Sequence, residues 1–122
     1  MIRSAQLGDY SVAYSGRIGE TVRFFVEFFE SGETAPVDLT GAVARMTLRR
    51  RVEDTVAALS LSSPSGGLTI EPTLGRITVH ITDEQTDAMD GTYVFDVKVE
   101  FASGDDLFLC GGTITLAKPV TR

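Results

Sequence analysis

The chain of 122 residues has one cysteine, Cys110, one histidine, His80, and no tryptophan. A single cysteine excludes an internal disulfide, which fits synthesis in a reducing compartment. No stretch approaches about 18 consecutive apolar residues, so the sequence predicts no membrane-spanning helix. Residues 1–10 lack the apolar run of a signal peptide. We therefore expect a globular protein that has no membrane partner.

Basic residues are also scarce, with 11 Lys and Arg against 17 Asp and Glu, so the net charge is −6. This charge opposes nonspecific binding to nucleic acid or to anionic lipid. The hydrophobic content of 43% with only 4 prolines is typical of a folded domain. At this length, residues 1–122 are predicted to form one domain, with residues 1–8 as a flexible or docking arm.

Residues with catalytic or metal-binding chemistry lack the partners that such chemistry needs. His80 stands alone at an outward position of a predicted strand, and Cys110 has no base or cation near it in sequence. The acidic residues that precede the longest strand do not have the spacing of an EF-hand loop; these are Asp83, Glu84, Asp87 and Asp90. We therefore expect no enzyme activity, no metal and no cofactor.

What the sequence does have is a clean alternation of apolar and polar residues over residues 91–101. Since successive strand side chains point to opposite faces, this run predicts a central strand with one buried face. The apolar face carries Tyr93, Phe95, Val97, Val99 and Phe101.

Shorter alternating runs separated by turn residues predict further strands. They lie at residues 9–15, 20–30, 42–50, 58–61, 68–70, 76–82 and 107–116. Asp38 and Gly41 predict a compact turn, and Gly111 and Gly112 predict a β-bulge in the last strand. The pattern predicts an all-β, immunoglobulin-like antiparallel β-sandwich of seven or eight strands.

One short helical turn is expected near residues 83–89. Thr82 and Gln85 have the spacing of a capping box, and Asp90 followed by Gly91 predicts the end of the turn. A helical turn that leads into a strand beginning Gly-x-Tyr resembles the corner before the sixth strand of immunoglobulin-like domains.

Six residues are candidates for contacts with other proteins. Three phenylalanines occupy outward strand positions, and three arginines form a basic strip; aromatics and arginine are enriched in interface cores. The candidates are Phe25, Phe29, Phe108, Arg45, Arg49 and Arg51. Two alternatives stay open: Phe25 and Phe29 are covered within the chain, or the arginines protect an edge strand as a solvated face.

Several segments along the chain together resemble a family of phage tail and baseplate proteins. They are GETVRF (19–24), PVDLTGA (36–42), MTLR (46–49), GLTI (67–70), GRITV (75–79), GTYVFD (91–96), GTIT (112–115) and VTR (120–122). These proteins carry the immunoglobulin-like domain seen at the N-terminus of baseplate upper proteins.

The resemblance implies a non-enzymatic structural protein of the virion that is made in the host cytoplasm and docks on a tail, baseplate or neck. It also implies other phage structural proteins as partners, and either a homo-oligomer or multiple copies on a symmetric particle. The alternative is a carbohydrate- or host-surface-binding module, which would use exposed Trp or Tyr platforms. The chain has no Trp, and its three Tyr lie mostly at inward positions.

Overall fold

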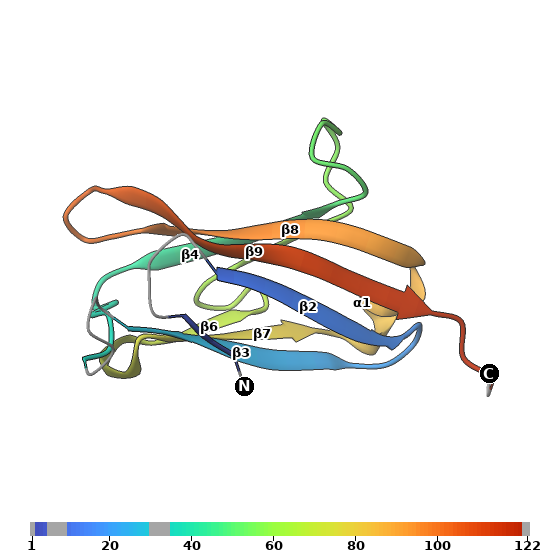
Figure 1. Cartoon of the computed structure of the whole chain (residues 1–122), viewed down its shortest axis with the longest axis horizontal. Helices are drawn as coiled ribbons and strands as arrows, with labels where there is room; N and C mark the ends of the chain where they lie inside the picture. The colour runs from blue at the N-terminus through green and yellow to red at the C-terminus, as the bar shows by residue number, and fades with distance from the viewer. Residues whose placement is uncertain (1, 5–9, 30–34, 121–122) are drawn as a thin grey trace.

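The computed structural model describes residues 2–4, 10–29 and 35–120, and these residues form two packed β-sheets (Figure 1). The four-stranded sheet contains, in order, β1 (Ile2–Ser4), β3 (Val22–Phe28), β7 (Arg76–Ile81) and β6 (Leu68–Glu71). The five-stranded sheet contains β2 (Tyr10–Arg17), β9 (Asp106–Ala117), β8 (Gly91–Glu100), β4 (Val43–Arg49) and β5 (Leu59–Ser62).

This arrangement confirms the predicted all-β, immunoglobulin-like sandwich, with two corrections. The described residues contain nine strands rather than seven or eight. The sheets are mixed rather than antiparallel, because β1 pairs in parallel with β3 and β2 pairs in parallel with β9. Both parallel pairs join strands far apart in sequence, where no hairpin turn imposes an antiparallel direction.

The expected arm at residues 1–8 is in part a strand. Residues 2–4 form β1 at the edge of the four-stranded sheet, whereas residue 1 and residues 5–8 lie outside the described residues.

The core lies between the sheets and follows the alternation of the sequence. In β8 four apolar side chains are buried, those of Tyr93, Phe95, Val97 and Val99, and Phe101, just beyond the end of the strand, is half-buried. β3 contributes Val22, Val26 and Phe28 from the facing sheet, all with almost no exposed surface. One continuous cluster of buried side chains thus joins both sheets.

Two local predictions from the sequence are confirmed at turns. The helix α1 (Asp83–Asp87) begins with a full capping box: the Thr82 hydroxyl accepts from the Gln85 N–H at 3.2 Å, and Gln85 Oε1 accepts from the Thr82 N–H at 2.9 Å. The Asp38 carboxylate accepts from the Thr40 N–H at 3.0 Å, and Gly41 has a φ of 75°. A 3₁₀ helix, η1 (Pro72–Leu74), occupies the turn before β7.

The corner before β8 also has the expected form. The Tyr93 hydroxyl accepts a hydrogen bond from the backbone N–H of Asp90 at 2.9 Å, and the Tyr93 ring is buried. This contact resembles the tyrosine corner of immunoglobulin-like sandwiches, in which a buried tyrosine fixes the loop that crosses between the sheets.

The predicted bulge at Gly111 and Gly112 is wrong in position. The register between β8 and β9 shifts between Val97 and Lys98, so the extra residue of β9 is Leu109. The two glycines are paired in register instead. A side chain at Gly112 would collide with the backbone of Val12, so the glycine permits the close approach of β2.

Candidate docking surface

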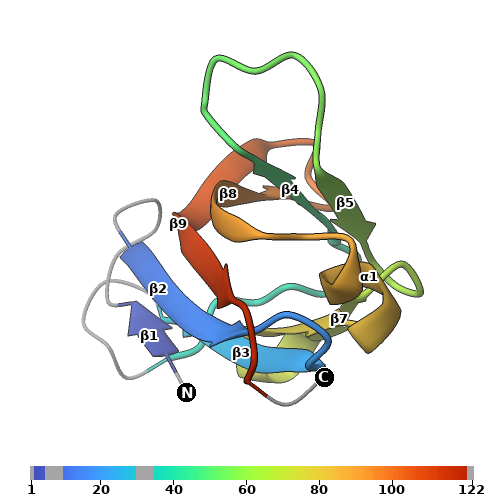
Figure 2. The same ribbon diagram turned by 90° about the vertical axis from the view of Figure 1, so that its right-hand side faces the viewer.

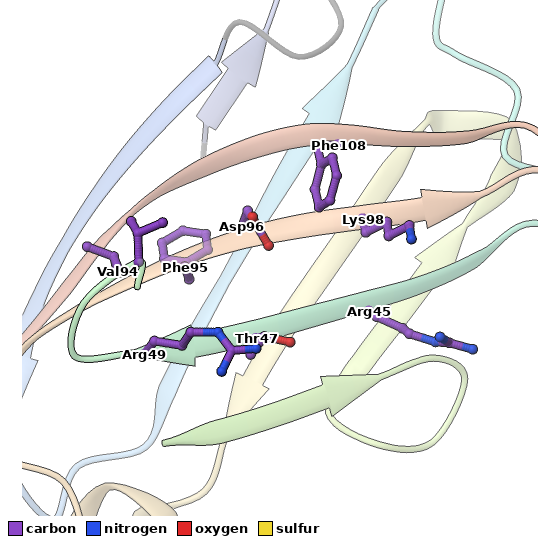
Figure 3. Close-up of a pocket in the computed structure, with 9 residues that line it drawn as sticks. Arg45, Thr47, Arg49, Val94, Phe95, Asp96, Lys98 and Phe108 are labelled. Carbon is purple, nitrogen blue, oxygen red and sulfur yellow. The ribbon is translucent and has the colours of Figure 1, made fainter. Parts of the chain in front are cut away.

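A groove with a volume of about 340 Å³ runs over the outer face of the five-stranded sheet (Figure 3). Its walls come mainly from outward positions of β4 and β8, with one residue each from β9 and the β4–β5 loop, and the inward-facing Phe95 of β8 also borders it. We call this surface the basic groove. Its lining residues are Arg45, Thr47, Arg49, Val52, Val94, Phe95, Asp96, Lys98 and Phe108.

The register of β4 against β8 assembles this surface. The strands are antiparallel, and outward residues stand opposite each other: Arg45 opposite Lys98, and Thr47 opposite Asp96. Phe108 of β9 is in turn opposite Lys98. Alternation alone predicts that these side chains point outward, and the register makes them neighbours.

The groove is cationic in a chain whose net charge is −6. Three cations and one carboxylate line it. Arg45 and Lys98 are directly opposite each other, and like charges in this position destabilise a strand pair. Lys98 is partly compensated, because its Nζ lies 3.8 Å from the Asp106 carboxylate and 5.8 Å from the centre of the Phe108 ring. Arg45 has no ion pair with any described residue.

Arg49 carries an unused donor at the groove. The side chain is half-buried, and its Nη1 is shielded from solvent without a hydrogen-bond partner among the described residues. A shielded polar group without a partner costs free energy.

Apolar side chains stand beside these charges. Phe108 is 56% exposed and Val52 is 80% exposed. Val52 belongs to the β4–β5 loop, residues 50–58, which projects beyond the body of the sandwich (Figure 2). At the base of this loop, the Arg50 guanidinium lies 4.4 Å from the centre of the Tyr93 ring.

Of the six candidate interface residues, the structure brings three together in the basic groove: Arg45, Arg49 and Phe108. Arg51 is exposed in the β4–β5 loop and does not line the groove; its N–H donates to the Asp54 carboxylate at 3.3 Å.

Phe25 lies in β3 of the other sheet and Phe29 directly follows that strand, and both are half-buried within the chain. The Arg76 guanidinium lies 4.4 Å from the centre of the Phe25 ring and 2.8 Å from the Glu27 carboxylate, which is itself buried. Phe29 pairs with Pro36 in an isolated β-bridge. The chain's own residues thus cover much of both rings.

The titratable residues set aside in the sequence lie apart from this groove. His80 is half-buried, with its Nε2 3.3 Å from the Arg23 guanidinium. Cys110 is 4% exposed, and burial raises the pKa of its thiol to about 12, with a smaller contribution from Asp96. Among the described residues, no three His, Cys, Asp or Glu side chains are grouped so as to hold a metal ion.

Sequence reasoning missed Lys98, Asp96 and Val52 as parts of this surface. The outward positions of Asp96 and Lys98 in β8 were visible in the alternation, but their neighbours depend on which strand pairs with β8 and in which register. Val52 reaches the groove only through the path of a loop.

Comparisons with known proteins show weak structural similarity. No protein-family model and no curated protein matches the chain. Among solved structures, the chain is similar to AggA, the major subunit of aggregative adherence fimbriae type I from Escherichia coli, with a TM-score of 0.34 and 12% identity. The match covers 88% of this chain and 89% of AggA, and at this level it has no bearing on function. None of the helices in the described part of the chain is long and apolar enough to cross a lipid bilayer.

Proposed function

We propose that this chain is a non-enzymatic structural protein of a bacteriophage particle that docks on a tail, baseplate or neck through protein–protein contacts. The observation that supports docking is the basic groove, where the exposed Phe108 ring stands beside the cationic Lys98 and across β8 from Arg45 and Arg49. Exposed aromatic and arginine side chains at the centre of a patch are typical of interface hot spots. The phage assignment rests on the resemblance of the turn and strand motifs.

In this proposal the sandwich is a rigid support and the groove is the contact surface. Two of its three arginine and lysine side chains, Arg45 and Arg49, have no ion pair within the described residues and are available to a neighbouring subunit. On a symmetric particle one such contact is repeated around the axis, which multiplies a modest affinity.

The test is quantitative mass spectrometry of phage particles purified from a culture that produces the chain. A fixed ratio of the chain to the tail components supports the proposal, and that ratio gives the copy number. Absence of the chain from particles, together with abundance in the infected cells, would overturn it.

A second candidate, a carbohydrate- or host-surface-binding module, uses the same groove. It is favoured by one observation: the exposed Phe108 ring and the Asp96 carboxylate line one groove, and sugars stack on aromatic rings while their hydroxyls bond to carboxylates. Binding of the pure chain to host cell-wall polysaccharide that is lost in a Phe108→Ala variant would select this function over the first.

A further inference from the structure

We propose that the basic groove of one copy of this chain accepts the acidic corner of a second copy, in a head-to-tail contact. The acidic corner consists of Asp83, Glu84, Asp87 and Asp90, in and just after α1. This inference deepens the proposed docking function, because it names the partner and the chemistry of the contact.

The cations of the basic groove have few carboxylate partners within the described part of the chain. Arg45 faces Lys98 across the strand pair, and no described carboxylate forms an ion pair with Arg45. Arg49 Nη1 is shielded from solvent and has no hydrogen-bond partner among the described residues. Carboxylates placed beside Arg45 and Lys98 would relieve the like-charge repulsion between them, since guanidinium groups bind carboxylates in a fixed two-point geometry.

The acidic corner is the complementary surface. All four carboxylate residues are exposed, and none takes part in an ion pair with a described residue. The helix itself accounts for Asp83 and Glu84, because acids in a first turn are favoured by the N-terminal dipole. Asp87 and Asp90 follow at the end of α1, where the same dipole disfavours negative charge. Helix stability therefore does not explain their presence.

The two surfaces belong to different parts of one molecule. The groove lies on the outer face of the five-stranded sheet, whereas α1 closes the end of the sandwich from which β8 begins (Figure 1). A contact between them joins unlike patches on successive copies, so it is heterologous: it closes into a ring if the rotation between copies allows, and otherwise it continues as a filament. Phe108 and Val52 beside the cations supply apolar area that such a contact covers.

Charge-swap variants of the full chain test this contact. The groove variant is Arg45→Glu with Arg49→Glu, and the corner variant is Glu84→Lys with Asp87→Lys. Sedimentation velocity over a wide range of protein concentration, at low and high salt, reports self-association. We expect wild type to self-associate more strongly at low salt. We expect each variant alone to have an association constant at least about tenfold lower than that of wild type.

The decisive sample is an equimolar mixture of the two variants. The corner variant keeps the basic groove, which can bind the unchanged acidic corner of the groove variant. The reversed, acidic groove can likewise bind the reversed, basic corner. Association should therefore return in the mixture. Both variants keep a net negative charge, so general attraction between them does not explain recovery. A matched control, Arg17→Glu with Arg23→Glu, makes the same charge change at exposed arginines outside the groove and should associate like wild type.

A wild-type chain that stays monomeric at low salt overturns the inference, and so does a control variant that dissociates as much as the groove variant. Because Arg49 is half-buried, circular dichroism melting checks that the groove variant folds. If the groove variant is unfolded, the corner variant, which changes only exposed residues, still tests the contact. The outcome is separable from the particle analysis. A chain present in particles but monomeric in solution defeats this inference and leaves the proposed function standing.

Discussion

At the scale of single residues, the clearest features are polar groups buried in the sandwich. Tyr93 and Cys110 both lie on β strands of the five-stranded sheet, and both are almost fully buried. The tyrosine hydroxyl has a partner, whereas the cysteine thiol stays neutral because burial opposes its ionisation. Tyr93 therefore contributes a hydrogen bond to stability, whereas the contribution of Cys110 depends on pH.

Removing the Tyr93 hydroxyl should cost about 1 kcal/mol of unfolding free energy, because the Asp90 N–H loses its acceptor. Tyr93→Phe keeps the ring beneath Arg50, so only the hydrogen bond is tested. Chemical denaturation measures the change. Tyr14→Phe is the control: the Tyr14 ring stacks on Phe24 at 5.3 Å, and its hydroxyl makes no hydrogen bond with a described residue. Equal losses in both variants would contradict this account of the corner.

The thiol of Cys110 should make stability fall at alkaline pH. Its pKa rises from an ordinary value of 9.0 to about 12 in the folded chain. As pH rises, the unfolded chain therefore releases this proton before the folded chain does. The contribution of the thiol to the free energy of unfolding is complete below about pH 9 and is lost as pH rises toward 12. The expected slope approaches about 1.4 kcal/mol per pH unit. Denaturation midpoints of wild type and Cys110→Ala, compared across this range, should diverge in slope; parallel curves would disprove the prediction.

At the scale of elements, α1 is held to the rest of the sandwich by a single buried side chain, Thr86. Its hydroxyl donates to the backbone carbonyl of Glu20 at 2.8 Å and accepts from the Gly19 N–H at 3.1 Å. These contacts fix the turn between β2 and β3 against the corner before β8. A five-residue helix has little stability of its own, so its position depends on such contacts.

Thr86→Val should destabilise the fold by about 1–3 kcal/mol, because it keeps the shape of the side chain but leaves both backbone groups without this partner. Thermal unfolding followed by circular dichroism gives the difference. The control is Thr69→Val in β6, where the side chain is exposed; we expect a change within about 0.5 kcal/mol. If the two variants melt together, the Thr86 contacts are not what positions α1.

The join between β2 and β9 depends on Gly112. Gly112→Ala should cost about 1–3 kcal/mol, since a methyl group there meets the backbone of Val12. Gly111→Ala is the matched comparison, because a Cβ atom at residue 111 would lie 3.1 Å from the nearest backbone atom, the Phe95 carbonyl oxygen. Denaturation midpoints should rank wild type, then Gly111→Ala, then Gly112→Ala. The reverse order of the two variants would show that the close approach of β2 is not the reason for the glycine.

The sequence predicts the elements of this fold better than their pairing. Alternation located β8 and its buried face because one side of that strand is core and the other is solvent. The capping box located α1 because both partners lie within one turn. The parallel pairs of β1 and β2 depend on contacts with distant strands, and the bulge at Leu109 depends on the register between β8 and β9; the alternation within one strand signals neither. For the same reason the groove was seen only as separate residues.

At the scale of the whole molecule, one core joins the two sheets, and its buried residues come from both. We therefore expect a single cooperative unfolding transition, as small domains usually show. Far-ultraviolet and near-ultraviolet circular dichroism should report the same midpoint, the second through the tyrosines because the chain has no tryptophan. Separate midpoints would mean that the sheets unfold independently, which contradicts a single domain.

The parallel pairing of β2 and β9 has a mechanical consequence. The two strands run side by side in the same direction over eight register pairs, from Tyr10 with Cys110 to Arg17 with Ala117. Tension applied to the N-terminal end of β2 and the C-terminal end of β9 acts along both strands in opposite directions. It therefore places the hydrogen bonds between the two strands under shear. All its hydrogen bonds then resist together, whereas a hairpin pulled from its open end gives way one bond at a time. A sandwich built in this way resists rupture when its ends are pulled.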